Sequence, residues 1–141
     1  MAYSSDEFGK SVGAPGLLVP NNPSTINSGH LQDSKDAEGG FALWTKQGEG
    51  DKVYSTKPAS GAIFKGIAQR EVIHDEFVAG DMVSVIEKGQ VWVKVSSDVQ
   101  SGGKVYLDTN GGFVATAGTE IEGAQYLTNA SNGGLALVQL G

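Results

Sequence analysis

The chain has 141 residues, of which 16 are acidic, 10 are basic, 21 are glycine and none is cysteine, and its formal charge is −6. The acidic balance argues against a nucleic-acid partner, because phosphate binding needs a basic surface. The missing cysteines exclude thiol nucleophiles, disulfides and the commonest structural zinc sites. No apolar run approaches the ~20 residues of a membrane span, and the polar start is unlike a signal peptide, so we expect no membrane partner and synthesis in a cytoplasm.

Residues 1–38 predict an extended N-terminal arm, because proline, serine, asparagine and glycine are frequent and neither the strand nor the helix period is sustained. The apolar group Leu17, Leu18 and Val19 stands between two prolines and is too short for a helix. It either docks on its own domain or grips a neighbouring subunit or partner. We therefore take Phe8 and these three residues as the candidate binding residues of the arm.

From residue 39 onward the chain consists of short apolar-alternating runs separated by glycine and small polar residues, which is typical of an all-β domain. The runs Phe41–Lys46, Lys52–Ser55 and Ile63–Arg70 are expected to be its first strands. Gly66 within the third run suggests a bulge or a close approach of two backbones.

The next two runs, Met82–Glu87 and Val91–Ser96, predict a hairpin with Gly89 in its turn. The valines of the second run share one face and are expected to face the core. Trp92 lies on the opposite face and has two interpretations. It belongs either to a second buried layer or to a subunit interface, where it would serve as an aromatic anchor.

Two further hairpins follow. The runs Lys104–Asp108 and Phe113–Ala115 flank an Asn-Gly turn, and Ile121–Thr128 and Leu135–Leu140 flank a turn with two glycines. In total, roughly seven to nine short strands are expected, which points to a compact β-sandwich or β-barrel of antiparallel strands. The sequence thus predicts two parts, an arm over residues 1–38 and a β-rich domain over residues 39–141.

Catalytic and cofactor motifs are not recognisable in this sequence. The only histidines, His30 and His74, stand in no nucleophile motif, and neighbouring acids on an extended segment point in opposite directions, which disfavours a metal site. The acidic residues single out no pair for hydrolysis, although a hydrolase stays open as a rival hypothesis. The segment before Lys88 resembles biotinyl and lipoyl carrier domains, but the residues that flank this lysine differ from the family's motif. We expect no enzyme activity and no cofactor.

An ordered series of motifs from about Pro15 to Gly141 resembles the structural cement, or decoration, proteins of tailed-phage heads. The family's usual Phe-Gly pair is replaced here by Phe41-Ala42. Each motif alone is weak, and the resemblance rests on their order and spacing. The motifs are Ala37-Glu38-Gly39-Gly40-Phe41, Phe64-Lys65-Gly66-Ile67-Ala68 with Arg70, Ala79-Gly80-Asp81-Met82-Val83-Ser84-Val85, Lys88-Gly89-Gln90-Val91-Trp92-Val93, Gly102 to Tyr106, and Gly134-Leu135-Ala136-Leu137-Val138.

The resemblance implies a capsid-binding β domain, often clustered as homotrimers on the outer surface of the virion, with the major capsid protein as its partner. It implies no catalytic residue. An arm of 38 residues, at ~3.3 Å per residue, would reach across a subunit boundary and bridge neighbouring capsid subunits. A module of a phage tail or receptor-binding assembly is the main alternative, because it would share the β-rich composition and the lack of catalytic motifs.

Overall fold

The computed structural model describes residues 14–19, 23–70 and 76–141, which contain nine β-strands and no helix. None of the described segments is therefore a helix that could cross a membrane. The strands are β1 (Thr25–Leu31), β2 (Ala42–Lys46), β3 (Lys52–Val53), β4 (Ala62–Ala68), β5 (Met82–Lys94), β6 (Lys104–Leu107), β7 (Phe113–Val114), β8 (Thr119–Tyr126) and β9 (Leu135–Leu140).

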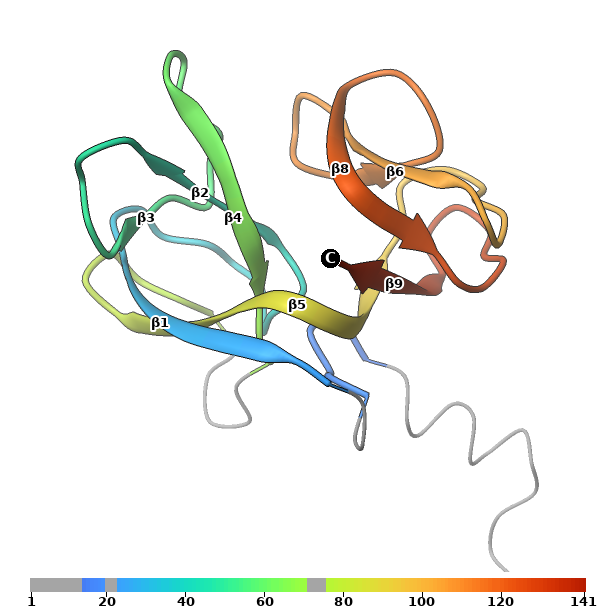
Figure 1. Ribbon diagram of the computed structural model, residues 1–141, viewed down its shortest axis with the longest axis horizontal. Helices are drawn as coiled ribbons and strands as arrows, with labels where there is room; N and C mark the ends of the chain where they lie inside the picture. The colour runs from blue at the N-terminus through green and yellow to red at the C-terminus, as the bar shows by residue number, and fades with distance from the viewer. Residues whose placement is uncertain (1–13, 20–22, 71–75) are drawn as a thin grey trace, which may run out of the picture.

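The strands form two lobes that share the long strand β5, which runs beneath both (Figure 1). The N-terminal lobe contains β1 to β4 and the first part of β5, up to Lys88. The C-terminal lobe contains β6 to β9 and the second part of β5, from Gly89. In the strand order β2-β4-β5-β9-β8-β6-β7, β5 is the strand that joins the lobes, because it pairs with β4 in one lobe and with β9 in the other.

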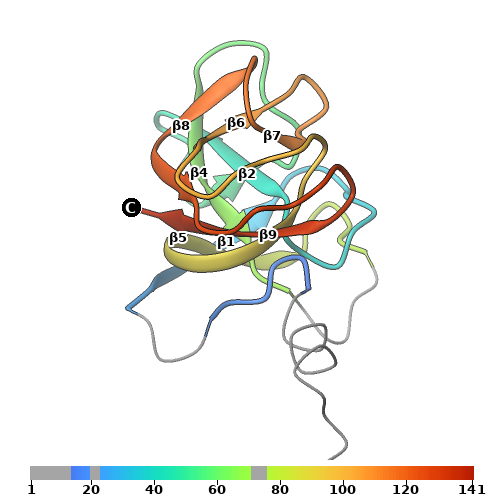
Figure 2. The same cartoon turned by 90° about the vertical axis from the view of Figure 1, so that its right-hand side faces the viewer.

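Each lobe curls until its two ends meet. In the N-terminal lobe, β1 pairs with both β5 and β3, and a bridge between Trp44 and Tyr54 joins β2 to the end of β3. In the C-terminal lobe, a bridge between Val95 and Phe113 joins the end of β5 to β7, the last strand of that series. The curvature of the C-terminal lobe is also visible from the side (Figure 2). The expected all-β fold is therefore confirmed, and it is a curled, partly closed sheet with one parallel strand pair, β1 with β3.

Strands β2, β4 and β5 form a wall between two hydrophobic cores. Adjacent residues such as Val85 and Ile86 in β5 point to opposite sides of this wall, and both are fully buried. One core lies within the N-terminal lobe, and the other joins the two lobes. The first contains Leu31, Phe41, Leu43, Val53, Ala68, Phe77, Val83 and Val85. The second includes Trp44, Ile67 and Ile86 of the wall together with Val91, Val93, Tyr126 and Val138 of the C-terminal lobe.

Gly66 of β4 lies where β4 and β5 of the wall approach each other closely. A β-carbon built on this residue would press against the carbonyl oxygen of Ile86 in β5 and the side chain of Val85. The register of β2 shifts directly opposite, between Leu43 and Trp44. Gly66 thus allows a close backbone approach beside a bulge, as the sequence predicted.

The prediction of a hairpin between Met82–Glu87 and Val91–Ser96 is wrong. Both runs belong to the single strand β5, and Gly89 has a φ of 129° within that strand and makes no reversing turn. The alternating pattern was correct, but the two halves find their partners elsewhere, β1 and β4 for the first half and β9 for the second. Lys88 accordingly lies inside a strand and not at a hairpin tip, so the geometry of a carrier-domain lysine is not present.

The other expected strands agree with the structure. The predicted run Phe41–Lys46 corresponds to β2 and Ile63–Arg70 to β4, whereas Lys52–Ser55 forms only the two-residue strand β3. The two hairpins of the C-terminal lobe are confirmed, because β6 pairs with β7 and β8 pairs with β9, both antiparallel. In the first hairpin, the carboxylate of Asp108 accepts hydrogen bonds from the backbone N–H groups of Asn110 and Gly112, which fixes the Asn-Gly turn.

The N-terminal 38 residues contain a strand that the sequence did not predict. Strand β1 pairs with β5 from Thr25 to His30, and Leu31 at its end is fully buried. Its exposed residues are polar apart from Ile26, so the strand has no alternation of apolar and polar residues by which the sequence could predict it. The division of the chain at residue 38 stays a prediction, although residues 14–19 and 23–38 of the predicted arm lie along the sheet.

Candidate interaction surface

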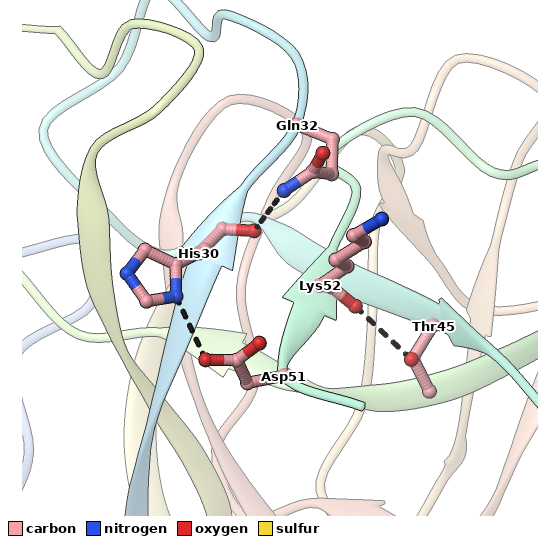
Figure 3. A network of polar contacts seen from close by, with 5 residues as sticks. All are labelled: His30, Gln32, Thr45, Asp51 and Lys52. Atoms are coloured by element: carbon pink, nitrogen blue, oxygen red, sulfur yellow. Dashed lines mark hydrogen bonds and ion pairs between the residues drawn. The ribbon is translucent and has the colours of Figure 1, made fainter. Parts of the chain in front are cut away.

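In residues 14–19, 23–70 and 76–141, no three His, Asp or Glu side chains converge on a position where they could hold a metal ion. His30 lies on β1, and its Nδ1 atom is 2.7 Å from Oδ2 of Asp51, with 46% and 62% of the two side chains exposed. This contact and the neighbouring backbone bonds hold β3 beside β1 (Figure 3). His74 lies outside the described residues. The most distinctive surface is instead an apolar row on the C-terminal lobe.

The outer face of β5 in the C-terminal lobe carries Gln90 and Trp92, since Val91 and Val93 point into the shared core with no exposed surface. On one side, Trp92 pairs with Leu137 of β9. On the other side, the backbone N–H of Trp92 donates to the carbonyl of Leu17 over 3.1 Å. Residues directly opposite on paired strands share a face, so Leu17, Trp92 and Leu137 form one continuous row, here called the apolar row.

All three side chains of the apolar row are half-buried. They are therefore partly covered by their neighbours and still present apolar surface to the outside. A polar row lies beside them. The amide of Gln90 donates to Oε1 of Gln139 over 3.0 Å, and Gln139 is paired with Gln125 of β8. The surface thus combines an apolar strip with amide groups that are able to donate and accept hydrogen bonds, a composition found at protein interfaces.

The short segment 14–19 is held on the body of the protein by a tight crossing of glycines. A β-carbon on Gly16 would lie 2.6 Å from the backbone N of Gly40, and Gly40 has a φ of 77°. The N–H of Arg70 donates to the carbonyl of Gly16 over 2.9 Å, and the Arg70 guanidinium pairs with the carboxylate of Glu38. The glycines at residues 16 and 40 thus bring three distant segments together and fix the position of Leu17 beside Trp92.

The structure places the candidate binding residues of the sequence analysis in different environments. Leu17 and Trp92 lie together in the apolar row, and Val19 stands beside Gln90 on the same face, because its N–H donates to the Gln90 carbonyl over 2.9 Å. Leu18 bridges to Val91 and packs against the shared core, so it points inward. Phe8 lies outside the described residues. Trp92 is half-buried, and both of its interpretations, a second buried layer and an aromatic anchor at a subunit interface, stay predictions.

Leu137 and Gln139 complete this surface, and sequence reasoning did not select them. The signal was present in the last strand, where Leu135 and Leu137 alternate with the buried residues Ala136 and Val138. A strand with apolar residues on both faces is expected either in a covered sheet or at an interface.

A cleft of about 510 Å³ separates the two lobes on another side of the molecule. It is spanned by Lys57, whose Nζ donates to Oγ1 of Thr119 over 2.9 Å and lies 5.5 Å from the centre of the Trp44 ring. Nearby, the hydroxyl of Tyr54 donates to the carboxylate of Glu49, and this hydrogen bond raises the pKa of Tyr54 above its ordinary value.

Comparison with known proteins gives matches of two kinds. A family model described as structural cement protein (E217 gp24/Pam3 gp6) matches residues 7–141. No curated protein sequence matches the chain. A solved chain from the capsid of Myoviridae phage XM1 is similar in structure, with a TM-score of 0.72, 14% identity and coverage of 99% of this chain and 98% of that one. The base of the head fibre protein gp8.5 of bacteriophage phi29 has a TM-score of 0.55, with 15% identity and coverage of 84% and 95%. At these identities, the two structures establish a shared fold only.

Proposed function

The chain belongs to the phage structural cement protein family, and from this we propose that it binds the outer surface of the phage head and stabilises the shell by bridging neighbouring capsid subunits. Its partner is then the major capsid protein, and its location is the exterior of the virion. The family is one of structural proteins, which agrees with a role that depends on binding and not on catalysis. The proposal also includes a homotrimeric arrangement on the capsid.

The observation that carries this proposal is the apolar row of Leu17, Trp92 and Leu137. When a partner covers the remaining apolar surface of tryptophan and leucine, binding is stabilised by about 25 cal/mol per Å² of apolar area buried. Aromatic anchors near the middle of an interface often supply most of the binding free energy. The glutamines beside the row provide hydrogen bonds at its polar margin.

Stabilisation of the shell follows from binding across a subunit boundary. A protein that binds only the assembled shell shifts the equilibrium away from separated subunits, and many copies add their modest contributions. Phe8 and Val19 are proposed as further contacts of the N-terminal segment, on either side of Leu17. Leu18 is not part of this proposed contact, because its side chain packs against the core of its own chain.

The test measures binding to phage heads that lack the protein. Trp92→Ala is compared with Tyr106→Ala, a change at another half-buried aromatic residue on a strand of the same lobe but outside the apolar row. We expect Trp92→Ala to weaken co-sedimentation with heads about tenfold or more, and Tyr106→Ala to leave it within about twofold of wild type. Equal binding by Trp92→Ala and wild type would contradict the proposed surface. Failure of the wild type to bind heads, together with binding to host cells, would favour the tail or receptor-binding alternative.

A further inference from the structure

Within the described part of the chain, one edge of the sheet has main-chain N–H and C=O groups that lack a partner. Strand β1 uses Asn27 and Gly29 to pair with β5, whereas the N–H of His30 points to the other side and donates to the Asp51 carbonyl over 2.8 Å. Because backbone groups alternate along a strand, the N–H and C=O groups of Ile26 and Ser28 point to the same side as those of His30. On that side, β3 pairs only with His30 and Leu31, and no other described segment pairs with the first part of β1.

This free edge has few of the features that usually prevent strand addition. Residues Thr25 to Ser28 are all exposed and include no proline and no charged side chain. Natural sheet edges are commonly protected by lysine, proline or a covering segment. Here the edge is closed at one end only, where the His30–Asp51 contact holds β3 in place (Figure 3).

We propose that an extended segment of the capsid protein adds to this edge as a further β-strand beside Thr25–Ser28. The inference rests on the proposed function and names the contact that the N-terminal lobe makes. Unpaired N–H and C=O groups in a row are complementary to another extended backbone, and this chemistry identifies the occupant as a strand. The added strand is short, because β3 occupies the position beside His30.

The side chains and the neighbouring surface suit such a strand. Ile26 is 40% exposed and offers an apolar contact to a residue opposite it. The free edge and residues 17–19 flank the same side of β5, one in each lobe. Strand addition and the apolar row would therefore engage the capsid at two places along one N-terminal segment.

Hydrogen exchange measures this contact directly in the wild-type protein. Free protein and head-bound protein are exchanged in deuterated buffer, quenched and read at single amides. The amides of Ile26 and Ser28 should exchange quickly in free protein and be slowed at least tenfold on heads. The amides of Asn27 and Gly29 serve as internal controls, because they bond to β5 and should be protected in both states.

A pair of variants tests the proposed hydrogen bond from the Ser28 N–H to the added strand. Ser28→Pro removes the outward N–H at a position where an edge strand tolerates proline, and Ser28→Ala removes only the hydroxyl. We expect Ser28→Pro to bind heads about five- to tenfold more weakly, with Ser28→Ala close to wild type and unchanged thermal unfolding of both.

The outcomes separate the two proposals. If wild-type protein binds heads while the Ile26 and Ser28 amides exchange as fast as in free protein, strand addition is wrong and the proposed function stands. If those amides become protected with rising protein concentration in the absence of heads, the occupant is a second copy of this chain, which overturns the capsid as partner of this edge. If the wild type does not bind heads at all, both proposals fail.

Discussion

The two lobes are built from strand pairs of different range. In the C-terminal lobe, β6 with β7 and β8 with β9 are hairpins of near neighbours in the chain. In the N-terminal lobe, β1 pairs with β5 and with β3, and neither partner is its neighbour in the chain. The C-terminal lobe therefore combines two local hairpins with one long-range pair, β5 with β9, whereas the N-terminal lobe is closed by the long-range pairs of β1. The difference predicts that the N-terminal lobe relies more heavily on the shared wall of β2, β4 and β5.

The lobes also differ in the kind of surface that they offer to a partner. The C-terminal lobe presents side chains, the apolar row with its neighbouring glutamines. The N-terminal lobe presents backbone groups at the free edge of β1. Binding through side chains depends on the shape of the surface and on each residue, whereas binding to a strand edge accepts many sequences. We therefore expect the apolar row to provide specificity and the edge of β1 to provide general attachment.

The largest expected effect is at the wall. Ile86→Ala removes a fully buried side chain from the core that joins the lobes and should lower the free energy of unfolding by about 2–5 kcal/mol. Chemical denaturation measures this loss. The matched control is Ile26→Ala, because Ile26 is directly opposite on β1 but 40% exposed, and it should cost less than about 1 kcal/mol. Similar losses for both variants would show that the shared core does not dominate.

A smaller loss is expected at the close approach of β4 and β5. Gly66→Ala places a methyl group against the Ile86 carbonyl and the Val85 side chain, and we expect a loss of about 1–3 kcal/mol from the resulting strain. Gly48→Ala is the comparison, since a β-carbon there meets no atom within 4 Å and only its φ of 84° is unfavourable. Thermal unfolding of both variants would compare the wall with a turn of the same N-terminal lobe. A greater loss at Gly48 would mean that turn geometry, and not the wall, limits the N-terminal lobe.

The range of the contacts also explains which features the sequence predicted. The Asn-Gly and Gly-Gly turns of the C-terminal lobe specify φ angles locally, so their hairpins could be located from a few residues. The prediction of a hairpin at Gly89 was wrong because a glycine between two alternating runs fits either a turn or the interior of one long strand. Only the distant strands that pair with β5 decide between these two structures. Trp92 and Leu17 were selected for their apolar character. Their common face with Leu137 depends on register, which the sequence does not contain locally.

Tyr126 provides a test within the C-terminal lobe. This buried residue donates a hydrogen bond from its hydroxyl to the Val114 carbonyl over 2.9 Å. Tyr126→Phe leaves that carbonyl without its donor and should cost about 1–2 kcal/mol. Tyr106→Phe is the control, because the Tyr106 hydroxyl has no hydrogen-bond partner among the described residues.

The same residue predicts a pH dependence. Burial raises the pKa of Tyr126, so the folded protein keeps the neutral phenol where the unfolded chain ionises. The stability that this provides is complete below about pH 10 and decreases as the pH rises above that value. Wild type should therefore lose stability above about pH 10 more steeply than Tyr126→Phe in denaturation at a series of pH values. Parallel curves for the two proteins would contradict burial of the neutral phenol.

The smallest effect on the free energy of unfolding is expected at Lys57, which connects the two lobes at the surface of the cleft. Lys57 is exposed, and its contacts with Thr119 and the Trp44 ring lie at the surface of the cleft, where water screens the charge. Lys57→Ala should therefore change the free energy of unfolding by less than about 1 kcal/mol. Lys46→Ala removes a similar contact, with the Tyr54 ring, entirely within the N-terminal lobe. Equal small effects would mean that the shared core already fixes the lobes. A distinctly larger effect of Lys57→Ala would show that the lobes move against each other when this lysine is absent, which denaturation curves with two separate transitions would reveal.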